Sequence, residues 1–308
     1  MSKQETLLAI LELDCVPSRL IERAAWLADV FECGVHLVLF EPDSGAFLGG
    51  FSVSNEAEVI REELFRAQAA IVDEYATQIR NTGVEVTTEV LQTRPLNDGI
   101  LEIAEKIQPK FVVKATDYHS ASERSTLVDT DWQLMRACPY PLWIVRSESM
   151  PERPFIVAAV DPGNAHDKPA ELDREIIRNA RAVAEATGGD LHLLHTYQRL
   201  TGIGTAANRA LTASKLPIDA IDAKIKAAHR SALDALAGDC GVAAERTHQL
   251  PGRTHEILPA FTRSHAAGLV VMGSLARWGI KRMIIGSTAE RVVDHLACDI
   301  LIVRHAEG

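Results

Sequence analysis

The chain has 308 residues, of which 32 are basic and 42 acidic, giving a formal net charge of −10. This length suits about two domains of ordinary size, and the acidic balance gives no general electrostatic reason to bind nucleic acid or an anionic membrane. The sequence contains no apolar run long enough to span a membrane, no signal-peptide core near its start and no C-x-x-C pair among its five cysteines. We therefore expect a cytoplasmic protein with reduced thiols and no cysteine–zinc cluster.

Strand and helix patterns alternate through the first half. An apolar run at residues 7–14 ends in Asp14, and a turn with Pro17 leads into a helix that stops before Gly34, since glycine commonly follows a helix end. The further elements that we expect here are a strand at 35–40, a long helix over 59–79, a strand at 84–91, a helix around 100–107, a strand at 111–113, a helix at 132–137 and a strand at 142–146.

The second half repeats this order. A strand at 155–161 ends in Asp161, as the first strand ends in Asp14, and a turn at Pro162-Gly163 follows. The further expected elements are a helix around 176–184, a strand at 191–195, a long helix over 218–236, a strand at 242–250, a helix around 257–261, a strand at 269–271, a helix at 289–296 and a strand at 300–304. Arg146 and Arg304 lie 158 positions apart, and so do Phe111 and Leu269. The chain therefore contains an internal duplication.

Alternating strands and helices predict parallel sheets that are covered by helices on both faces. The sequence thus predicts two tandem doubly wound α/β domains, each with a five-stranded parallel sheet. We place the first domain at residues 1–147 and the second at 155–308. The polar, proline-containing segment 148–154 is the expected linker.

A glycine-bounded loop follows the strand that ends at Met272. It consists of Gly273, two residues, Ala276, nine residues and then Gly286-Ser287-Thr288, after which helical periodicity begins. A helix that starts at a glycine presents backbone N–H groups and the positive end of its dipole, which favours a phosphate. The segment Ser287-Thr288-Ala289-Glu290 also fits a capping box, which closes a helix start without any ligand. Both interpretations stay open.

This loop, G-x2-A-x9-G-S, resembles the signature loop G-x2-G-x9-G-S/T of the universal stress protein family, with Ala276 at the position of the second glycine. The segments Asp294-His295-Leu296 and Cys298-Asp299 resemble the last helix and strand of the same family, and Thr130–Leu134 and Cys138–Trp143 resemble its tandem members. The resemblance covers both halves of the chain. It implies two domains with strand order 3-2-1-4-5, a fold like that of adenine nucleotide α-hydrolases.

The same resemblance implies a stress-response protein that binds ATP or a related adenine nucleotide, accompanied by Mg²⁺, in its second domain. It maps the adenine and ribose contacts to Asp161, Met272 and Gly273. It maps the phosphate contacts to Ala276, Gly286, Ser287 and Thr288, and Arg277 and Lys281 could screen the phosphate charge. A Cβ at Ala276 costs roughly 1–2 kcal/mol if that residue needs a left-handed conformation.

The first half lacks such a loop, because no glycine occurs between Gly99 and Gly163. The 158-residue offset places Val128-Asp129-Thr130 where Gly286-Ser287-Thr288 stand. Asp129 and Asp131 would cap the helix start and repel phosphate. We therefore expect no ATP binding through this loop in the first half, and we interpret Asp14 as a turn residue.

No catalytic set and no metal site are expected. The sequence has neither a P-loop nor a G-x-S-x-G elbow, although slow ATP hydrolysis stays open. His192 and His195 lie three apart on a strand and so face opposite sides.

Two irregular excursions, at 41–55 and 196–216, carry apolar residues that could roof a ligand pocket. They support an alternative function, a scaffold that binds an apolar or acyl ligand or a partner protein. Strands 142–145 and 300–303 could pair as an internal pseudo-dimer, and a homodimer stays open.

Overall fold

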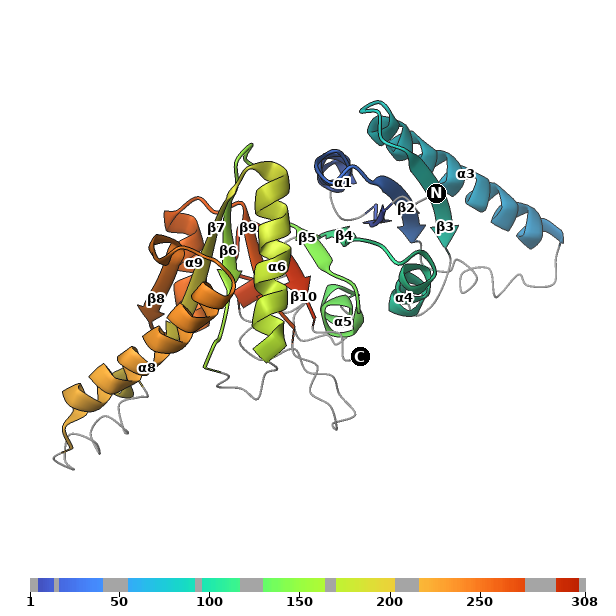
Figure 1. Ribbon diagram of the computed structural model, residues 1–308. Coiled ribbons are helices and arrows are strands. Elements are labelled where there is room, and N and C mark those ends of the chain that lie inside the picture. The colour runs from blue at the N-terminus through green and yellow to red at the C-terminus, as the bar shows by residue number, and fades with distance from the viewer. Residues whose placement is uncertain are drawn as a thin grey trace. The chain divides into compact units, whose positions relative to one another are not determined.

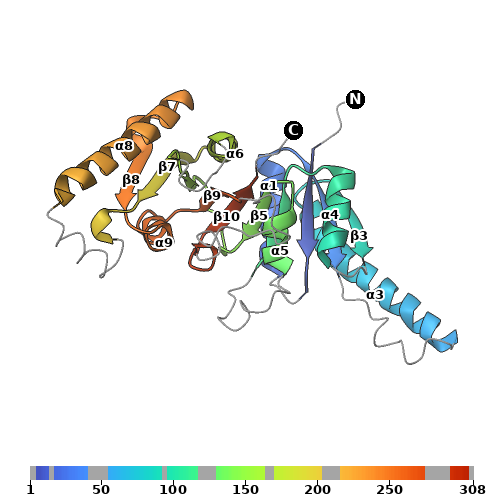
Figure 2. The same ribbon diagram turned by 90° about the horizontal axis from the view of Figure 1, so that it is seen from below.

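The computed structural model describes residues 5–13, 17–40, 55–91, 96–116, 130–163, 170–202, 216–274 and 292–304. The chain divides into two compact units, Met1–Met150 and Pro151–Gly308. Each unit alternates strands with helices (Figures 1 and 2). The expected α/β class and the tandem organisation are therefore confirmed.

The first unit is built around five parallel strands. Its elements in chain order are β1 (Thr6–Leu11), α1 (Pro17–Val30), β2 (Gly34–Phe40), α3 (Asn55–Arg80), β3 (Val86–Leu91), α4 (Leu96–Ile107), β4 (Val112–Ala115), α5 (Thr130–Ala137) and β5 (Leu142–Val145). Parallel pairing places the strands in the order β3-β2-β1-β4-β5. This is the expected order 3-2-1-4-5, with β1 at the centre.

The second unit has the same arrangement. Its elements are β6 (Phe155–Ala159), α6 (Ala170–Thr187), β7 (Asp190–Tyr197), η3 (Leu200–Gly202), α8 (Ile218–Asp239), η4 (Ala244–Arg246), β8 (Thr247–Pro251), α9 (Thr254–Ser264), β9 (Leu269–Gly273) and β10 (Asp299–Val303). Parallel pairing gives the order β8-β7-β6-β9-β10, with β6 at the centre.

The inner strands β1, β4 and β9 are buried along nearly their whole length, as parallel strands covered on both faces must be. In the first unit the fully buried Trp143 of β5 forms the middle of an aromatic cluster. Its ring meets those of Trp26 and Phe111 edge-on, with centroids 6.3 and 5.7 Å away. Such edge-to-face pairs stabilise a core beyond the apolar area that they bury.

Several element bounds differ from those predicted from the sequence, among them the ends of the first strand of each unit, which stop at Leu11 and Ala159. The third strand of the first unit begins at Val86 rather than at residue 84. Its counterpart begins at Thr247 rather than at 242, because residues 244–246 form a 3₁₀ turn after Gly241, whose φ is +63°. Tyr197, which the sequence assigned to an irregular excursion, belongs to β7 and is buried. Residues 200–202 of the same excursion form η3. Residues 41–54 and 203–215 of the two excursions lie outside the described residues.

Helices α3 and α8 both run past the ends of the strands beside them (Figures 1 and 2). The second half of α3 buries Val72, Ala76 and Ile79. The first half continues the helix and exposes Val59, Ile60, Leu64 and Phe65. The projecting turns of α3 therefore present a run of large apolar side chains at the surface.

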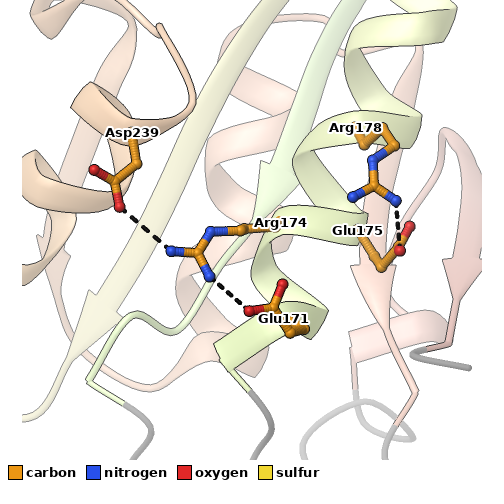
Figure 3. Close-up of polar contacts among 5 residues, drawn as sticks. All are labelled: Glu171, Arg174, Glu175, Arg178 and Asp239. Carbon is orange, nitrogen blue, oxygen red and sulfur yellow. Dashed lines mark hydrogen bonds and ion pairs between the residues drawn. The ribbon is translucent and has the colours of Figure 1, made fainter. Parts of the chain in front are cut away.

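The outer face of α6 carries arginine–glutamate pairs one turn apart (Figure 3). Arg174 lies 2.8 Å from Glu171, and Arg178 lies 2.5 Å from Glu175. Arg174 also reaches Asp239 at the end of α8, at 3.4 Å. Because these pairs lie at the surface and are screened by solvent, they contribute little to stability, and α6 is held mainly by its buried face.

Two half-buried histidines meet on β7 and β8. His192 Nδ1 lies 3.0 Å from His248 Nε2, and the ring of Phe155 stacks on His192 with centroids 4.1 Å apart. Burial, and then the charge of His248, lowers the pKa of His192 to about 4. Burial also lowers the pKa of His248. The folded protein therefore disfavours protonation at this pair.

Acidification is expected to destabilise the second unit as the pH falls from about 6.5 to about 4. Unfolded histidine titrates near 6.5, so the unfolded chain binds a proton that folded His192 resists, and stability present above pH 6.5 is lost below it. We expect a loss on the order of 2 kcal/mol, given the partial exposure of the pair. Urea denaturation of the wild type and of His192→Gln at pH 7.5, 5.5 and 4.5 measures this. Equal pH slopes for the two proteins would refute the prediction.

Candidate functional site

The second unit changes its direction of winding between β6 and β9. These two strands lie side by side, with Ala159 paired to Met272. From β6 the chain passes to β7 on one side, while β9 lies on the other. In open α/β sheets ligands bind beyond the carboxyl ends of the strands at such a point. The structure therefore brings Asp161, Met272 and Gly273 to one edge of the sheet.

The other candidate residues lie outside the described residues. They are Ala276, Arg277, Lys281, Gly286, Ser287 and Thr288. Past that stretch, Val292 and Val293 are helical and buried, followed by a turn at 294–295 and the buried Leu296. The helix expected at 289–296 therefore ends three residues earlier than predicted.

Gly273 has a packing reason for lacking a side chain. A Cβ built there would lie 2.7 Å from Cδ2 and 2.9 Å from Cγ of Leu172, a buried residue of α6. Real Cβ atoms essentially never come so close. Gly273 was predicted to open the loop, and its lack of a side chain also lets α6 approach the end of β9.

Replacing Gly273 with alanine is expected to destabilise the protein by about 1–3 kcal/mol, because Leu172 must leave its position in a packed core. Gly202→Ala is the matched control, since a Cβ at Gly202 would meet nothing within 4 Å. Chemical denaturation of both variants checks the difference. A Gly273→Ala protein as stable as Gly202→Ala would show that the contact is easily relieved.

Asp161 lies just beyond β6 and keeps 28% of its side chain exposed. Its backbone N–H donates to Asp173 Oδ1 at 3.0 Å. His195 Nδ1 lies 3.9 Å from the Asp161 carboxylate and 3.1 Å from the carbonyl oxygen of Val160. The carboxylate of Asp161 is thus partly exposed to solvent at the carboxyl end of β6, whereas its backbone N–H is hydrogen-bonded to Asp173.

The strand registers identify the residue of the first unit that corresponds to Asp161. Leu8 pairs with His36 and with Val112, and Val157 pairs with His192 and with Val270. Matching these two sets places Glu12 at the position of Asp161. The sequence-based match of Asp14 with Asp161 is therefore wrong by two residues.

The cause of this error is a difference in length between the two halves. Val157 lies 149 positions after Leu8, whereas His192 lies 156 positions after His36. The segment between the first two strands of a unit is therefore seven residues longer in the second unit. The two aspartates that end the apolar runs therefore do not occupy equivalent positions, although a turn with proline follows each run.

In the first unit the corresponding edge is occupied by an ion cluster. Lys114 Nζ lies 2.7 Å from Glu12 Oε2 and 2.5 Å from Asp131 Oδ1, and Thr116 donates a hydrogen bond to Asp131. The 158-residue offset places Lys114 at the position of Met272. The side chain of Lys114 is only 3% exposed. The first unit therefore uses its strand-end positions for contacts within the protein.

The environment of Lys114 keeps it charged. Burial by itself would lower the pKa of Lys114, but the carboxylates of Asp131 and Glu12 outweigh it and raise that pKa above its ordinary value. Asp131 was predicted to cap a helix start, and no role was predicted for Glu12 or Lys114. A single lysine within the apolar run Val112–Ala115 was the signal that could have revealed the cluster, since a buried charge requires a partner.

Among the residues that the structure describes, no group of three or more His, Cys, Asp and Glu side chains could hold a metal ion. Within the same ranges, no helix is both long and apolar enough to cross a membrane.

Comparison with known proteins identifies relatives of both halves. The model of the universal stress protein family matches residues 7–146 and 156–304. Universal stress protein E of Escherichia coli K12 is 28% identical over 252 residues, which cover 81% of this chain and 78% of that protein.

Two solved structures share the fold along the whole chain. One is a functionally unknown protein from Pseudomonas aeruginosa PAO1, with a TM-score of 0.71 and 22% identity, covering 98% of this chain and 92% of that one. The other is a universal stress protein from Archaeoglobus fulgidus DSM 4304, with a TM-score of 0.65 and 16% identity, covering 99% and 100%. These likenesses extend the tandem architecture to both proteins.

Proposed function

This chain belongs to the universal stress protein family as a tandem of two α/β domains, and on that premise we propose that it is a cytoplasmic stress-response protein whose second domain binds ATP or a related adenine nucleotide. The nucleotide would act as a regulatory ligand of a binding module rather than as a substrate. We propose domain boundaries at residues 1–147 and 155–308.

The contrast between the two strand edges supports this proposal. In the second unit the carboxylate of Asp161 reaches solvent beside Met272 and Gly273. In the first unit the corresponding Glu12 is bound by the buried Lys114. In the described part of the chain, no lysine is paired with Asp161 as Lys114 is with Glu12. A carboxylate is an acceptor suited to the hydroxyl groups of a ribose.

The phosphates would lie beyond Gly273, over the helix start formed by Gly286, Ser287 and Thr288. Backbone N–H groups and the helix dipole favour an anion at such a place, and the hydroxyl groups of the two side chains can add donors. Arg277 and Lys281 would screen the remaining charge. Mg²⁺ would bind together with the phosphates and neutralise part of their charge. Asp161, Met272 and Gly273 would contact the base and the sugar.

Equilibrium dialysis against ATP, ADP, AMP and GTP, each with and without Mg²⁺, tests this proposal. We expect saturable binding of the adenine nucleotides and weaker binding of GTP. No binding and no thermal shift at millimolar ATP would refute the proposed function. Phosphate release that exceeds background and disappears in Asp161→Ala would instead indicate an enzyme.

Native mass spectrometry of the purified protein separates nucleotide binding from the alternative of an apolar or acyl ligand. The exposed apolar side chains on α3 are the observation that favours the alternative. An adduct with the mass of an acyl chain, and none with that of a nucleotide, would support it. The same spectra report whether the chain is a monomer or a homodimer.

A further inference from the structure

Two buried side chains hold the peptide bond that joins Val160 to Asp161. On one side, His195 Nδ1 lies 3.1 Å from the carbonyl oxygen of Val160. On the other, the N–H of Asp161 donates to Asp173 Oδ1 at 3.0 Å. His195 comes from β7 and is 1% exposed, and Asp173 comes from the first turn of α6 and is 2% exposed. Both polar atoms of one peptide are therefore fixed by different elements.

The partners of His195 determine its tautomer. A carbonyl oxygen can only accept, so the proton of His195 lies on Nδ1. In the neutral ring Nε2 is then an acceptor, and it lies 2.8 Å from Nδ1 of His229 on α8, which must donate. The ring of His229 stacks on those of His195 and Tyr197, with centroids 5.0 and 5.4 Å apart. One chain of hydrogen bonds therefore runs from α8 to the carbonyl of Val160.

The titratable groups around His195 are Asp161, Asp173 on α6 and His229 on α8. Burial lowers the pKa of His195, although the Val160 carbonyl and the Asp161 carboxylate act against this. A second proton, on Nε2, would face the N–H of His229 at 2.8 Å. His195 is therefore neutral at pH 7, and the hydrogen-bond chain is complete there.

The first unit has neither of these side chains. In the strand register, Leu39 occupies the position of His195, three residues after His36 as His195 is after His192. The same 156-residue offset places Pro17 at the position of Asp173. Neither leucine nor proline carries a side-chain hydrogen-bonding group. The two polar contacts therefore occur in the unit in which the strand-edge carboxylate reaches solvent.

We propose that His195 and Asp173 are positioning residues, which fix the Val160–Asp161 peptide and so aim the Asp161 carboxylate at the sugar of the bound nucleotide. The effect on affinity rests on the proposed function, whereas the fixed peptide is a property of the protein alone. Through its hydrogen bond with His195, His229 connects this arrangement to α8. A preformed carboxylate loses little conformational freedom on binding, which raises affinity.

Paired variants separate the hydrogen bonds from the packing. His195→Leu introduces the residue that the first unit has at this position, and Asp173→Ala removes the acceptor. His195→Asn keeps an N–H donor near the position of Nδ1, and Asp173→Asn keeps the Oδ1 acceptor. His192→Asn is the matched control, because His192 lies on the same strand and contacts His248 instead.

Two measurements are made on each full-length variant: the Kd for ATP with Mg²⁺, and the hydrogen-exchange rate of the Asp161 amide by NMR. We expect His195→Leu and Asp173→Ala to weaken ATP binding about tenfold, which corresponds to about 1.4 kcal/mol, and to speed exchange at Asp161. The two conservative variants should recover most of both losses. Wild-type ¹⁵N spectra should show the proton of His195 on Nδ1.

Unchanged affinity and unchanged exchange in both His195→Leu and Asp173→Ala would overturn the proposal, and so would an equal loss in His192→Asn. If the wild type binds no nucleotide, the proposed function fails. The exchange rates of the Asp161 amide then test by themselves whether His195 and Asp173 fix the Val160–Asp161 peptide. Faster exchange confined to His195→Leu and Asp173→Ala would then support it, and rates equal to the wild type would refute it.

Discussion

Replacing Lys114 with methionine is expected to destabilise the first unit by about 3–5 kcal/mol. The substitution leaves the carboxylates of Glu12 and Asp131 close together and largely buried, without the cation that holds them, and breaking a buried ion pair on one side carries a cost of this size. Methionine is the residue that the second unit has at the same position, so the change is compatible with the fold. Urea denaturation at pH 7.5 measures the loss.

Lys110→Met is the matched control, because Lys110 pairs with Glu5, whose side chain is 61% exposed. This surface pair should contribute no more than about 1 kcal/mol. Adding Glu12→Gln and Asp131→Asn to Lys114→Met should restore part of the loss, since it removes the buried charges. A Lys114→Met protein as stable as Lys110→Met would mean that water or other groups already neutralise the cluster.

The ion cluster also has a defined pH dependence. Because the folded-state pKa of Lys114 is raised, its contribution is fully present below about pH 10.4, where unfolded lysine titrates. The contribution is lost as the pH rises through the folded-state pKa. At neutral pH the ion cluster of the first unit therefore stays intact, and its side chains fill the space at the carboxyl ends of β1 and β4.

Replacing Asp161 with alanine is expected to weaken ATP binding about a hundredfold. A hydrogen bond to a charged group contributes about 1.5–3 kcal/mol, and losing two such bonds to the ribose removes about 3 kcal/mol, which is a factor of about a hundred. Fluorescence titration with an ATP analogue labelled on its phosphates, which leaves the ribose unmodified, gives the Kd of the wild type and the variant.

Glu12→Gln is the control for Asp161→Ala, because Glu12 occupies the same register position in the first unit. It should leave the affinity for ATP unchanged, whatever it does to the stability of the first unit. If Glu12→Gln weakened binding as much as Asp161→Ala, the nucleotide would depend on both units, and if Asp161→Ala bound like the wild type, Asp161 would not contact the sugar.

The strands and their order were predictable because they depend on local pattern. Apolar runs such as 7–11 and 300–303 alternate with helical periodicity, and the duplication of the pattern fixes two equivalent sheets. The ion cluster was not predictable in the same way. Glu12 and Lys114 are 102 residues apart, and they become neighbours only when β1 and β4 lie side by side.

The candidate site was predictable in part, for the same physical reason. Residues at strand ends, such as Asp161 and Met272, follow directly from the strand pattern. The environment of His195 does not, because its partners, Val160 just after β6 and His229 on α8, are more than 30 residues away. The strand period showed only that His192 and His195 face opposite sides of the sheet, which the structure confirms.

Calorimetric titration of the full chain with ATP and Mg²⁺ tests most directly whether the second unit alone holds a nucleotide. We expect one nucleotide per chain, bound by the wild type and by Glu12→Gln and lost at the same concentrations in Asp161→Ala. Two nucleotides per chain, or one that Asp161→Ala still binds with unchanged affinity, would place a site outside the strand edge of β6 and β9 and contradict that expectation.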